Sequence, residues 1–434
     1  MRKLFGTDGI RGRAYEYPLT EDIAEKLGYA VAIFSEKPKI VIGRDTRVSG
    51  KDFETAVVKG VSKAGGEAIL LGILPTPAVA FLTRKLNAGA GIMISASHNP
   101  AQDNGLKIFS SKGFKLEDEI EEEIEILMFK EQKEIPNGKI TMQTNAKKQY
   151  IEFAKSSFNS TMEEIKIVVD CANGAACTVV KDIFSDLKAE VIAINTEKKG
   201  NNINCNCGAL HTASLREAVI KEKADIGIAL DGDADRIIVI DEKGRELDGD
   251  YLLYICAKLI KYKGRLKNNT VVSTVMSNAG FDEAMKKEGI IVKSTKVGDK
   301  YVIEEMKKNN YSLGGEQSGH IILADYSTTG DGILCGLEII KAMKEYNKPL
   351  SELADGIQKY PQVLINLPVK EKKDVKQLKS YSLIQKIEKH LKGKGRVLVR
   401  YSGTELILRV MVEAKENADI YAKQIAEELK KELC

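Results

Sequence analysis

Three aspartates alternate with other residues in a short segment of the chain, residues 230–236, which reads LDGDADR. Side chains at every second position of an extended backbone point to one side, so Asp231, Asp233 and Asp235 would crowd three negative charges together. Hard cations such as Mg²⁺ take carboxylate oxygens as ligands and would neutralise that charge. An EF-hand calcium loop has similar acidic spacing, but Arg236 stands where that loop requires glycine. The segment therefore predicts a magnesium site, with an aspartate-rich structural turn as the alternative.

A second polar loop, SASHNP over residues 95–100, follows the apolar residues 91–94. Ligands bind beyond the carboxyl ends of strands in open α/β sheets. A serine at such a position can act as a nucleophile when a base or a cation is close. Ser97 is therefore a candidate nucleophile, with His98 beside it. Taken alone, the loop is explained equally well as a turn rich in small polar residues.

Two further loops carry groups that suit a phosphorylated sugar. Residues 314–320 read GGEQSGH, where Glu316 and Ser318 point the same way and could bind sugar hydroxyls. Near the end of the chain, two arginines flank a turn of hydroxyl residues and glycine, a combination that suits phosphate. The members of this phosphate loop are Arg400, Ser402, Gly403, Thr404 and Arg409. An ordinary hairpin turn is the alternative explanation of each loop.

Basic groups also lie beside glycines near the N-terminus. The segments 6–12 (GTDGIRG) and 43–47 (GRDTR) could each form a structural turn with an internal arginine–aspartate pair. Residues 103–107 (DNGLK) follow the Ser97 loop closely and place Lys107 within reach of the same site.

An apolar strand, a polar turn and an amphipathic helix recur three times and would position these loops. The copies open at residues 39–43, 165–170 and 270–275. Strands alternating with helices predict α/β domains with mostly parallel sheets. After Pro361 the pattern changes to a smaller α+β unit. We therefore expect three similar α/β domains over residues 1–148, 149–245 and 246–358, followed by a C-terminal domain over residues 359–434.

The composition excludes several classes of protein. The chain has 434 residues, of which 43% are hydrophobic and 29% charged, and a net charge of +4. That charge balance argues against a dedicated nucleic-acid binder. The apolar stretch 68–83 contains two prolines and is too short to span a bilayer, and no secretory leader is evident at the start. Seven scattered cysteines indicate reduced thiols. We expect a cytoplasmic protein with no nucleic-acid or membrane partner.

The whole set of motifs resembles the α-D-phosphohexomutase superfamily. From Phe5 to Glu413 the chain carries, in order, FGTDGIRG, GRDTR, SASHNP, DNGLK, DGDADR, GGEQSGH and RYSGTE. The resemblance implies three domains of similar mixed α/β fold and a C-terminal domain resembling the TATA-box-binding-protein fold. Within the superfamily, FGTDGIRG, GEQSGH, KVGDKYV at 296–302 and TTGDGI at 328–333 resemble members that act on glucosamine phosphates. Phosphomannomutase/phosphoglucomutase members more often carry Met where Gln317 stands.

The resemblance also implies residue roles. Ser97 would be the phosphoserine, and one Mg²⁺ would be bound by Asp231, Asp233, Asp235 and a phosphoserine oxygen. Glu316 and Ser318 would hold sugar hydroxyls, and the phosphate loop would hold the non-reacting phosphate. The remaining catalytic candidates around the reaction site are Arg11, Lys107, Arg236 and His98, with Lys107 a candidate general acid/base or charge stabiliser.

Two departures from the family pattern stand out. Leu406 occupies a position where the family usually has proline. The loop 203–211, INCNCGALH, has Cys205 where a polar residue is expected, and the resemblance assigns this loop no catalytic part.

The implied activity is that of an isomerase, an intramolecular phosphotransferase of amino-sugar metabolism. It would interconvert glucosamine 6-phosphate and glucosamine 1-phosphate through a phosphoserine enzyme, as a step toward UDP-N-acetylglucosamine. Glucosamine 1,6-bisphosphate would be the intermediate and activator, and a homodimer is typical of bacterial relatives. A phosphomannomutase/phosphoglucomutase with the same mechanism is the main alternative. A metal-dependent phosphatase using Ser97 and a non-catalytic sugar-phosphate binder are the others.

Overall fold

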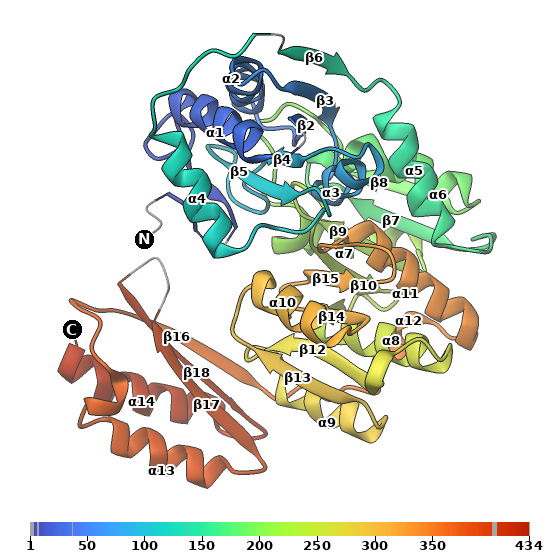
Figure 1. Cartoon of the computed structure of the whole chain (residues 1–434). Coiled ribbons are helices and arrows are strands. Elements are labelled where there is room, and N and C mark those ends of the chain that lie inside the picture. Colours follow the sequence, from blue (N-terminus) through green and yellow to red (C-terminus); the bar gives the residue numbers. More distant parts are fainter. Residues whose placement is uncertain (1–3, 7, 37, 137, 402–405, 434) are drawn as a thin grey trace. The chain divides into compact units, whose positions relative to one another are not determined.

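The computed structural model describes residues 4–6, 8–36, 38–136, 138–401 and 406–433 (Figure 1). The chain divides into two compact units. The first contains residues 1–276 and 290–355, and the second contains residues 277–289 and 356–434. No helix in the described part of the chain combines the length and the apolar character needed to cross a membrane.

The first unit is built on three sheets. The first sheet has the strand order β1–β5–β4–β2–β3–β6, the second β11–β10–β9–β7–β8, and the third β13–β12–β14–β15. The strands of the first sheet are β1 (Ile10–Arg13), β2 (Lys39–Arg44), β3 (Glu67–Ile73), β4 (Ala90–Ile94), β5 (Asp103–Ser110) and β6 (Lys139–Met142). Those of the second are β7 (Lys166–Asp170), β8 (Glu190–Ile194), β9 (Ile226–Leu230), β10 (Ile237–Asp241) and β11 (Glu246–Leu247). Those of the third are β12 (Thr270–Thr274), β13 (Ile291–Thr295), β14 (Leu313–Gly315) and β15 (Ile321–Leu323).

The three sheets repeat one arrangement of four strands. In each, the first strand is parallel to the second and the third, and the third is antiparallel to the fourth. The same relations join β7, β8, β9 and β10. The structure therefore confirms the expectation of three similar mixed α/β domains. The connection from the third to the fourth strand occupies the same place in every sheet, and these connections are the loops at 95–102, 231–236 and 316–320.

Helices fill the connections of the first unit. They are α1 (Glu21–Phe34), α2 (Gly50–Lys63), α3 (Thr76–Lys85), α4 (Asp118–Met128), α5 (Ala146–Ser156), α6 (Val180–Asp186), α7 (Ala213–Glu222), α8 (Gly249–Tyr262), α10 (Asp299–Asn309), α11 (Gly332–Tyr346) and α12 (Leu350–Ala354). Short 3₁₀ turns are η1 (Ala175–Thr178), η2 (Gly208–Leu210) and η3 (Lys267–Asn269). The strands β4, β9 and β12 are buried along their whole length, as expected for sheet interiors covered on both faces.

Helix capping explains part of the motif at 328–333. Asp331 is the N-cap of α11 and accepts hydrogen bonds from the backbone N–H groups of Ile333 and Leu334, both at 3.0 Å. Its carboxylate also accepts one from the Tyr150 hydroxyl at 2.9 Å. Burial raises the pKa of Asp331 to about 6 in spite of these three bonds. The motif therefore fixes the start of the helix that follows β15.

The second unit is a small antiparallel sheet with two helices packed on one face. Its strands are β16 (Gln362–Pro368), β17 (Gly395–Tyr401) and β18 (Ile407–Ala414), in the order β16–β18–β17. Its helices are α9 (Ala279–Lys287), α13 (Tyr381–Leu391) and α14 (Ala418–Leu433), and η4 (Val375–Gln377) is a 3₁₀ turn. Alternate residues of the strands form one apolar core with α13 and α14. The α+β class expected for the C-terminal part is therefore confirmed.

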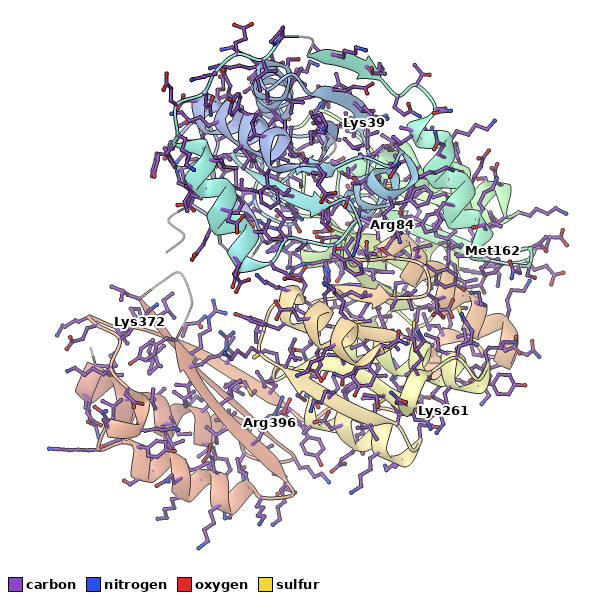
Figure 2. The ribbon with its side chains drawn as sticks, viewed as in Figure 1. Lys39, Arg84, Met162, Lys261, Lys372 and Arg396 are labelled. Atoms are coloured by element: carbon purple, nitrogen blue, oxygen red, sulfur yellow. The ribbon has the colours of Figure 1, made fainter. Side chains whose placement is uncertain are left out.

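The other face of this small sheet carries charged residues. Arg396, labelled in Figure 2, lies on β17 and donates a hydrogen bond to Glu413 of β18 at 2.6 Å. Further along the same two strands, Arg400 stands directly opposite Arg409. Cross-strand partners in an antiparallel pair lie on the same face, so the two arginines face the same side of the sheet.

Candidate active site

Ser97 follows β4 and is buried, with an exposed fraction of 1%. Its Oγ donates a hydrogen bond to Oδ2 of Asp231 at 2.5 Å and lies 3.4 Å from Oδ1 of Asp235. Its backbone N–H donates to the Ser95 hydroxyl at 2.9 Å. The predicted nucleophile and the predicted metal loop therefore meet, although they lie more than a hundred residues apart in the chain.

A buried arginine holds the Ser97 loop from within the first sheet. Nε of Arg47 pairs with Asp45 at 2.9 Å. The rest of the guanidinium donates to the backbone carbonyls of Ser97 at 3.0 Å, Asn99 at 2.8 Å and Asp103 at 2.8 Å. The internal arginine–aspartate pair expected in GRDTR is confirmed, and its arginine also holds the backbone of the Ser97 loop.

The three aspartates of the second sheet form one buried cluster. Each offers a carboxylate oxygen, and these oxygens lie within 4.8 Å of one another. Burial and the charges of Asp235 and Asp233 raise the pKa of Asp231 well above its ordinary value. Among the described residues, Oδ1 of Asp233 is buried and has no hydrogen-bond partner. An oxygen-lined cluster with excess negative charge and an unsatisfied oxygen fits a hard divalent cation.

Lys107 of β5 supplies positive charge to this cluster. Its side chain is 1% exposed, and Nζ lies 2.7 Å from Asp233, 3.0 Å from Asp235 and 3.4 Å from Asp8. Burial would lower the pKa of Lys107, but these three carboxylates outweigh it and raise the pKa above its ordinary value. Lys107 is therefore a protonated ammonium at neutral pH.

Two arginines border the same cluster. Arg11 of β1 pairs with Asp8, which confirms the second internal arginine–aspartate pair expected near the N-terminus. Arg236 follows Asp235 directly, with Nε 4.0 Å from its Oδ1. Burial would lower the pKa of both arginines, but neighbouring carboxylates outweigh it and raise both pKa values. Glu316 of the third loop is one of the carboxylates that act on Arg236.

His98 is half-buried beside the nucleophile, with Nδ1 3.3 Å from Oγ of Ser97. Burial and the charges of Arg236 and Arg11 lower the pKa of His98 to about 3. The imidazole is therefore neutral at neutral pH.

The third loop places its two predicted sugar ligands differently. Glu316 is half-buried, and its Oε1 accepts a hydrogen bond from the backbone N–H of Gly298 at 3.0 Å. Ser318 is exposed at the tip of the loop. Gly319 has a φ of +90°, and a Cβ there would lie 2.0 Å from the carbonyl oxygen of Ile237. Glycine is therefore required where this loop passes against the start of β10.

The sequence reasoning missed a second layer of buried charge. Lys115 bridges Asp8 of the first domain and Asp299 at the start of α10 in the third. Nε2 of His320 lies 3.4 Å from Asp299, and its Nδ1 lies 3.7 Å from Asp235. Burial would lower the pKa of His320, but the two aspartates raise it overall. This chain of charges joins the metal loop to the third domain.

The phosphate loop belongs to the second unit. Burial and the neighbouring Arg409 lower the pKa of Arg400. Like charges directly opposite each other on paired strands are destabilising unless an anion lies between them. The pair therefore forms a candidate phosphate site. Ser402, Gly403 and Thr404 lie outside the described residues.

Four family models of the phosphoglucomutase/phosphomannomutase type match the chain in succession. They are α/β/α domain I at residues 2–135, domain II at 148–244, domain III at 248–360 and the C-terminal domain at 364–431. The chain therefore belongs to the phosphoglucomutase/phosphomannomutase family, and it is an isomerase of the phosphohexomutase class.

The chain is similar in sequence to one curated protein and in fold to two solved structures. A protein of Thermoanaerobacter pseudethanolicus named phosphoglucosamine mutase is 49% identical over 448 residues, which cover 100% of both chains. The fold is shared with a phosphoglucomutase/phosphomannomutase family protein of Burkholderia thailandensis, with a TM-score of 0.81, 21% identity and coverage of 99% and 97%. It is also shared with Aspergillus fumigatus N-acetylphosphoglucosamine mutase in complex with GlcNAc-6P and magnesium, with a TM-score of 0.69, 18% identity and coverage of 99% and 96%.

Replacing Lys115 with methionine tests the second layer of charge. Lys115→Met leaves Asp8 and Asp299 without their shared cation, and loss of one partner from a buried ion pair costs about 3 kcal/mol of stability. Chemical denaturation at pH 7 should show this decrease in the free energy of unfolding. Lys112→Met, on an exposed lysine of the same turn, should change it by less than about 0.5 kcal/mol.

The difference between wild type and Lys115→Met should depend on pH. Lys107, Lys115 and Arg11 outweigh the burial of Asp8 and hold the pKa of Asp8 well below its ordinary value of 3.8. The resulting stability is present above that value and is lost as the pH falls through the folded-state pKa. The difference should therefore shrink below about pH 4. Equal stability of the two proteins at pH 7 would show that the bridge contributes nothing.

Proposed function

We propose that the chain interconverts glucosamine 6-phosphate and glucosamine 1-phosphate, with Ser97 as the phosphoryl carrier. The observation that supports this proposal best is the position of Ser97. Its Oγ is buried 2.5 Å from Asp231, in a cluster of three carboxylates. Phosphoryl transfer requires little covalent chemistry from the protein and depends on positioning and charge neutralisation, which this site provides.

A phosphoenzyme explains how the phosphoryl group moves between distant hydroxyls of one sugar. Phosphorylated Ser97 gives its phosphoryl group to O1 of glucosamine 6-phosphate, and in the net reaction the proton of O1 passes to Oγ of Ser97. The products are glucosamine 1,6-bisphosphate and the free hydroxyl of Ser97. After the bisphosphate reorients, Oγ of Ser97 attacks the phosphorus at O6, and the proton of Oγ passes to O6. Glucosamine 1-phosphate leaves, and the phosphoserine is restored.

Asp231, Asp233 and Asp235 would hold one Mg²⁺ together with a phosphoserine oxygen. The unsatisfied oxygen of Asp233 and the raised pKa of Asp231 support a cation at this position. When bound, Mg²⁺ supplies positive charge to the oxygens of the transferring phosphoryl group.

The protein's own cations would complete the neutralisation. Three carboxylates keep Lys107 protonated. A general base must begin the reaction neutral, so Lys107 is better suited to stabilise negative charge than to act as a general base. Arg11 and Arg236 border the same cluster and would bind the transferring group. His98, with a pKa of about 3, would act as a neutral hydrogen-bonding partner of the Ser97 loop.

Two further groups of residues would bind the substrate. Glu316 and Ser318 would hold the sugar hydroxyls. Arg400 and Arg409, with Ser402, Gly403 and Thr404, would hold the non-reacting phosphate. A second phosphate site is needed because the bisphosphate must remain bound while its two ends exchange places. The lowered pKa of Arg400 beside Arg409 supports an anion there.

The preference for the amino sugar rests on relatives and motifs. Proteins named phosphoglucosamine mutase are 47–49% identical over their full length. A phosphomannomutase/phosphoglucomutase with the same mechanism is the alternative. Its substrates, the glucose and mannose phosphates, differ from glucosamine phosphates only at C2. The domain boundaries near 148, 245 and 358, the homodimer and the cytoplasmic location stay predictions.

Intact-mass measurement tests the phosphoserine. A fraction of the wild-type chain should be heavier by one phosphoryl group, and that fraction should be absent from Ser97→Ala. Turnover per enzyme should fall about a thousandfold or more in Ser97→Ala, because the nucleophile is removed. Ser111→Ala, on an exposed serine, should leave both the mass pattern and the turnover unchanged. Full turnover in Ser97→Ala would exclude Ser97 as the carrier.

Substrate preference separates the two mutase hypotheses. We expect kcat/KM to be highest for glucosamine 1-phosphate when it is compared with glucose 1-phosphate and mannose 1-phosphate under identical conditions. A large preference for either neutral sugar would contradict the amino-sugar assignment while leaving the mutase mechanism intact. Net release of inorganic phosphate at the rate of substrate loss would instead indicate a phosphatase.

Removal of divalent cations tests the metal site. Chelation should abolish turnover, and added Mg²⁺ should restore it. Asp233→Asn should raise the Mg²⁺ concentration needed for half-maximal rate by about tenfold or more, because one ligand charge is lost. Asp182→Asn, at a half-exposed aspartate of α6, is the matched control and should leave that concentration unchanged. Turnover that is indifferent to chelation would contradict the metal assignment.

A further inference from the structure

The loop at residues 200–208, after β8 of the second sheet, reaches the nucleophile loop of the first sheet. Asn204 lies on this loop and is 9% exposed. Its Nδ2 donates hydrogen bonds to the carbonyl oxygen of Ser97 at 2.8 Å and to that of Asn99 at 2.9 Å. A single side-chain amide therefore holds the backbone on both sides of His98.

The same two carbonyl oxygens also accept hydrogen bonds from Arg47. Nη2 of Arg47 lies 3.0 Å from the Ser97 oxygen and 2.8 Å from the Asn99 oxygen. A carbonyl oxygen has two lone pairs and can accept both donors. Arg47 follows β2 in the first sheet, whereas Asn204 follows β8 in the second. The nucleophile loop is thus held from two domains at the same two atoms.

The position of Asn204 is itself fixed by buried contacts. Its backbone N–H donates to the carbonyl of Ala172 at 2.9 Å. The Asp170 carboxylate, at the end of β7, accepts hydrogen bonds from the backbone N–H groups of Ala172 at 2.9 Å and Gly208 at 2.8 Å. These bonds attach both Ala172 and the end of the loop to β7. The loop is therefore a rigid support for the amide.

The contact also lies against the metal loop. A Cβ at Gly232 would lie 2.7 Å from the Ser97 carbonyl oxygen and 3.0 Å from Nδ2 of Asn204. Glycine at this position lets the three aspartates approach Ser97 while the amide remains in place. Asn204, Ser97 and the cluster around Asp231 therefore share one packed region.

Ser97 has a backbone conformation that needs such support. Its φ is +53°, in the left-handed region that is unfavourable for a non-glycine residue. Hydrogen bonds to its own carbonyl and to that of Asn99 hold this conformation, which directs Oγ at Asp231.

We propose that Asn204 is a positioning residue for phosphoryl transfer, which sets the Oγ of Ser97 from across the domain boundary. This inference rests on the proposed function, because it assumes that Ser97 carries the phosphoryl group. Asn204 does not contact Oγ, so it acts through the backbone of the loop. Misplacement of a reacting atom by about 1 Å can cost about a hundredfold in rate. Removal of the amide should therefore lower kcat.

Asn206 provides a matched control for Asn204. It lies on the same loop, is exposed and has a φ of +51°, close to the +58° of Asn204. Alanine tolerates the left-handed conformation less well than asparagine, so replacing either residue with alanine introduces the same backbone strain. A difference between Asn204→Ala and Asn206→Ala therefore reports the side-chain amide and not the strain of the loop.

Asn204→Asp is a second variant that keeps the shape and the backbone tolerance of asparagine. Its carboxylate would face two carbonyl oxygens and could donate no hydrogen bond while ionised. It should therefore lower kcat at least as much as Asn204→Ala, and it provides a test if the alanine variant fails to fold.

The experiment compares full-length wild type, Asn204→Ala, Asn204→Asp and Asn206→Ala, with turnover expressed per phosphorylated Ser97 counted by intact mass. We expect kcat to fall about 10- to 100-fold in both Asn204 variants, with KM within about twofold of wild type. KM should stay close to the wild-type value because the proposed binding groups for the sugar hydroxyls and the non-reacting phosphate do not include Asn204. A purely structural role would lower the phosphorylated fraction or the melting temperature without changing kcat per phosphorylated site.

The outcomes separate the two proposals. If Asn204→Ala and Asn206→Ala both had the kcat of the wild type per phosphorylated Ser97, the positioning role of Asn204 would be overturned, and the proposed function would stand. A wild-type chain that shows no phosphoserine and isomerises no hexose phosphate would overturn the proposed function, and this inference with it. A tenfold or larger kcat deficit confined to the Asn204 variants supports the positioning role.

Discussion

The mutual repulsion of three buried carboxylates beside Ser97 is the constraint on which the rest of the site depends. Asp231, Asp233 and Asp235 come from one short loop, and burial removes the water that would otherwise screen them. Lys107 and His320 outweigh burial at Asp235 and hold its pKa well below the ordinary value, whereas the pKa of Asp231 is raised well above it. The cluster is therefore only partly neutralised by the protein. It suits a divalent cation, which would balance the remaining negative charge. Arg11 and Arg236 border the cluster and would face the negative charge of a transferring phosphoryl group.

The repeated sheet explains how three loops that are distant in the chain take equivalent places in their sheets. In each sheet the connection between the third and fourth strands lies at the same position. Each of these connections carries polar or charged side chains. The first connection carries Ser97, the proposed nucleophile, the second carries the three aspartates, and the third carries Glu316. The net charge of +4 does not reveal this arrangement. The charges of the candidate site belong to a few buried lysines and arginines that lie beside carboxylates, and their contributions cancel in the total.

Much of the fold and part of the site could be predicted from the sequence, because their signals are local. Apolar runs such as β2, β7 and β12 are continuous in the chain, and the two internal arginine–aspartate pairs span only two or three residues. The charge bridge through Lys115 could not be predicted, because its partners lie 107 and 184 residues away. The contacts of the Asn204 amide could not be predicted either. Its partners are backbone carbonyls more than a hundred residues away, and backbone carbonyls leave no pattern in the sequence.

In the proposed reaction, Ser97 donates its own phosphoryl group to the sugar. This transfer is tested most directly with a chain that carries radiolabelled phosphate on Ser97, mixed with an excess of unlabelled glucosamine 6-phosphate in a single turnover. We expect the label to leave the protein and to appear in glucosamine 1,6-bisphosphate and then in the glucosamine monophosphates, with almost none in inorganic phosphate. Label that stays on the protein during turnover, or that leaves only as inorganic phosphate, would contradict it.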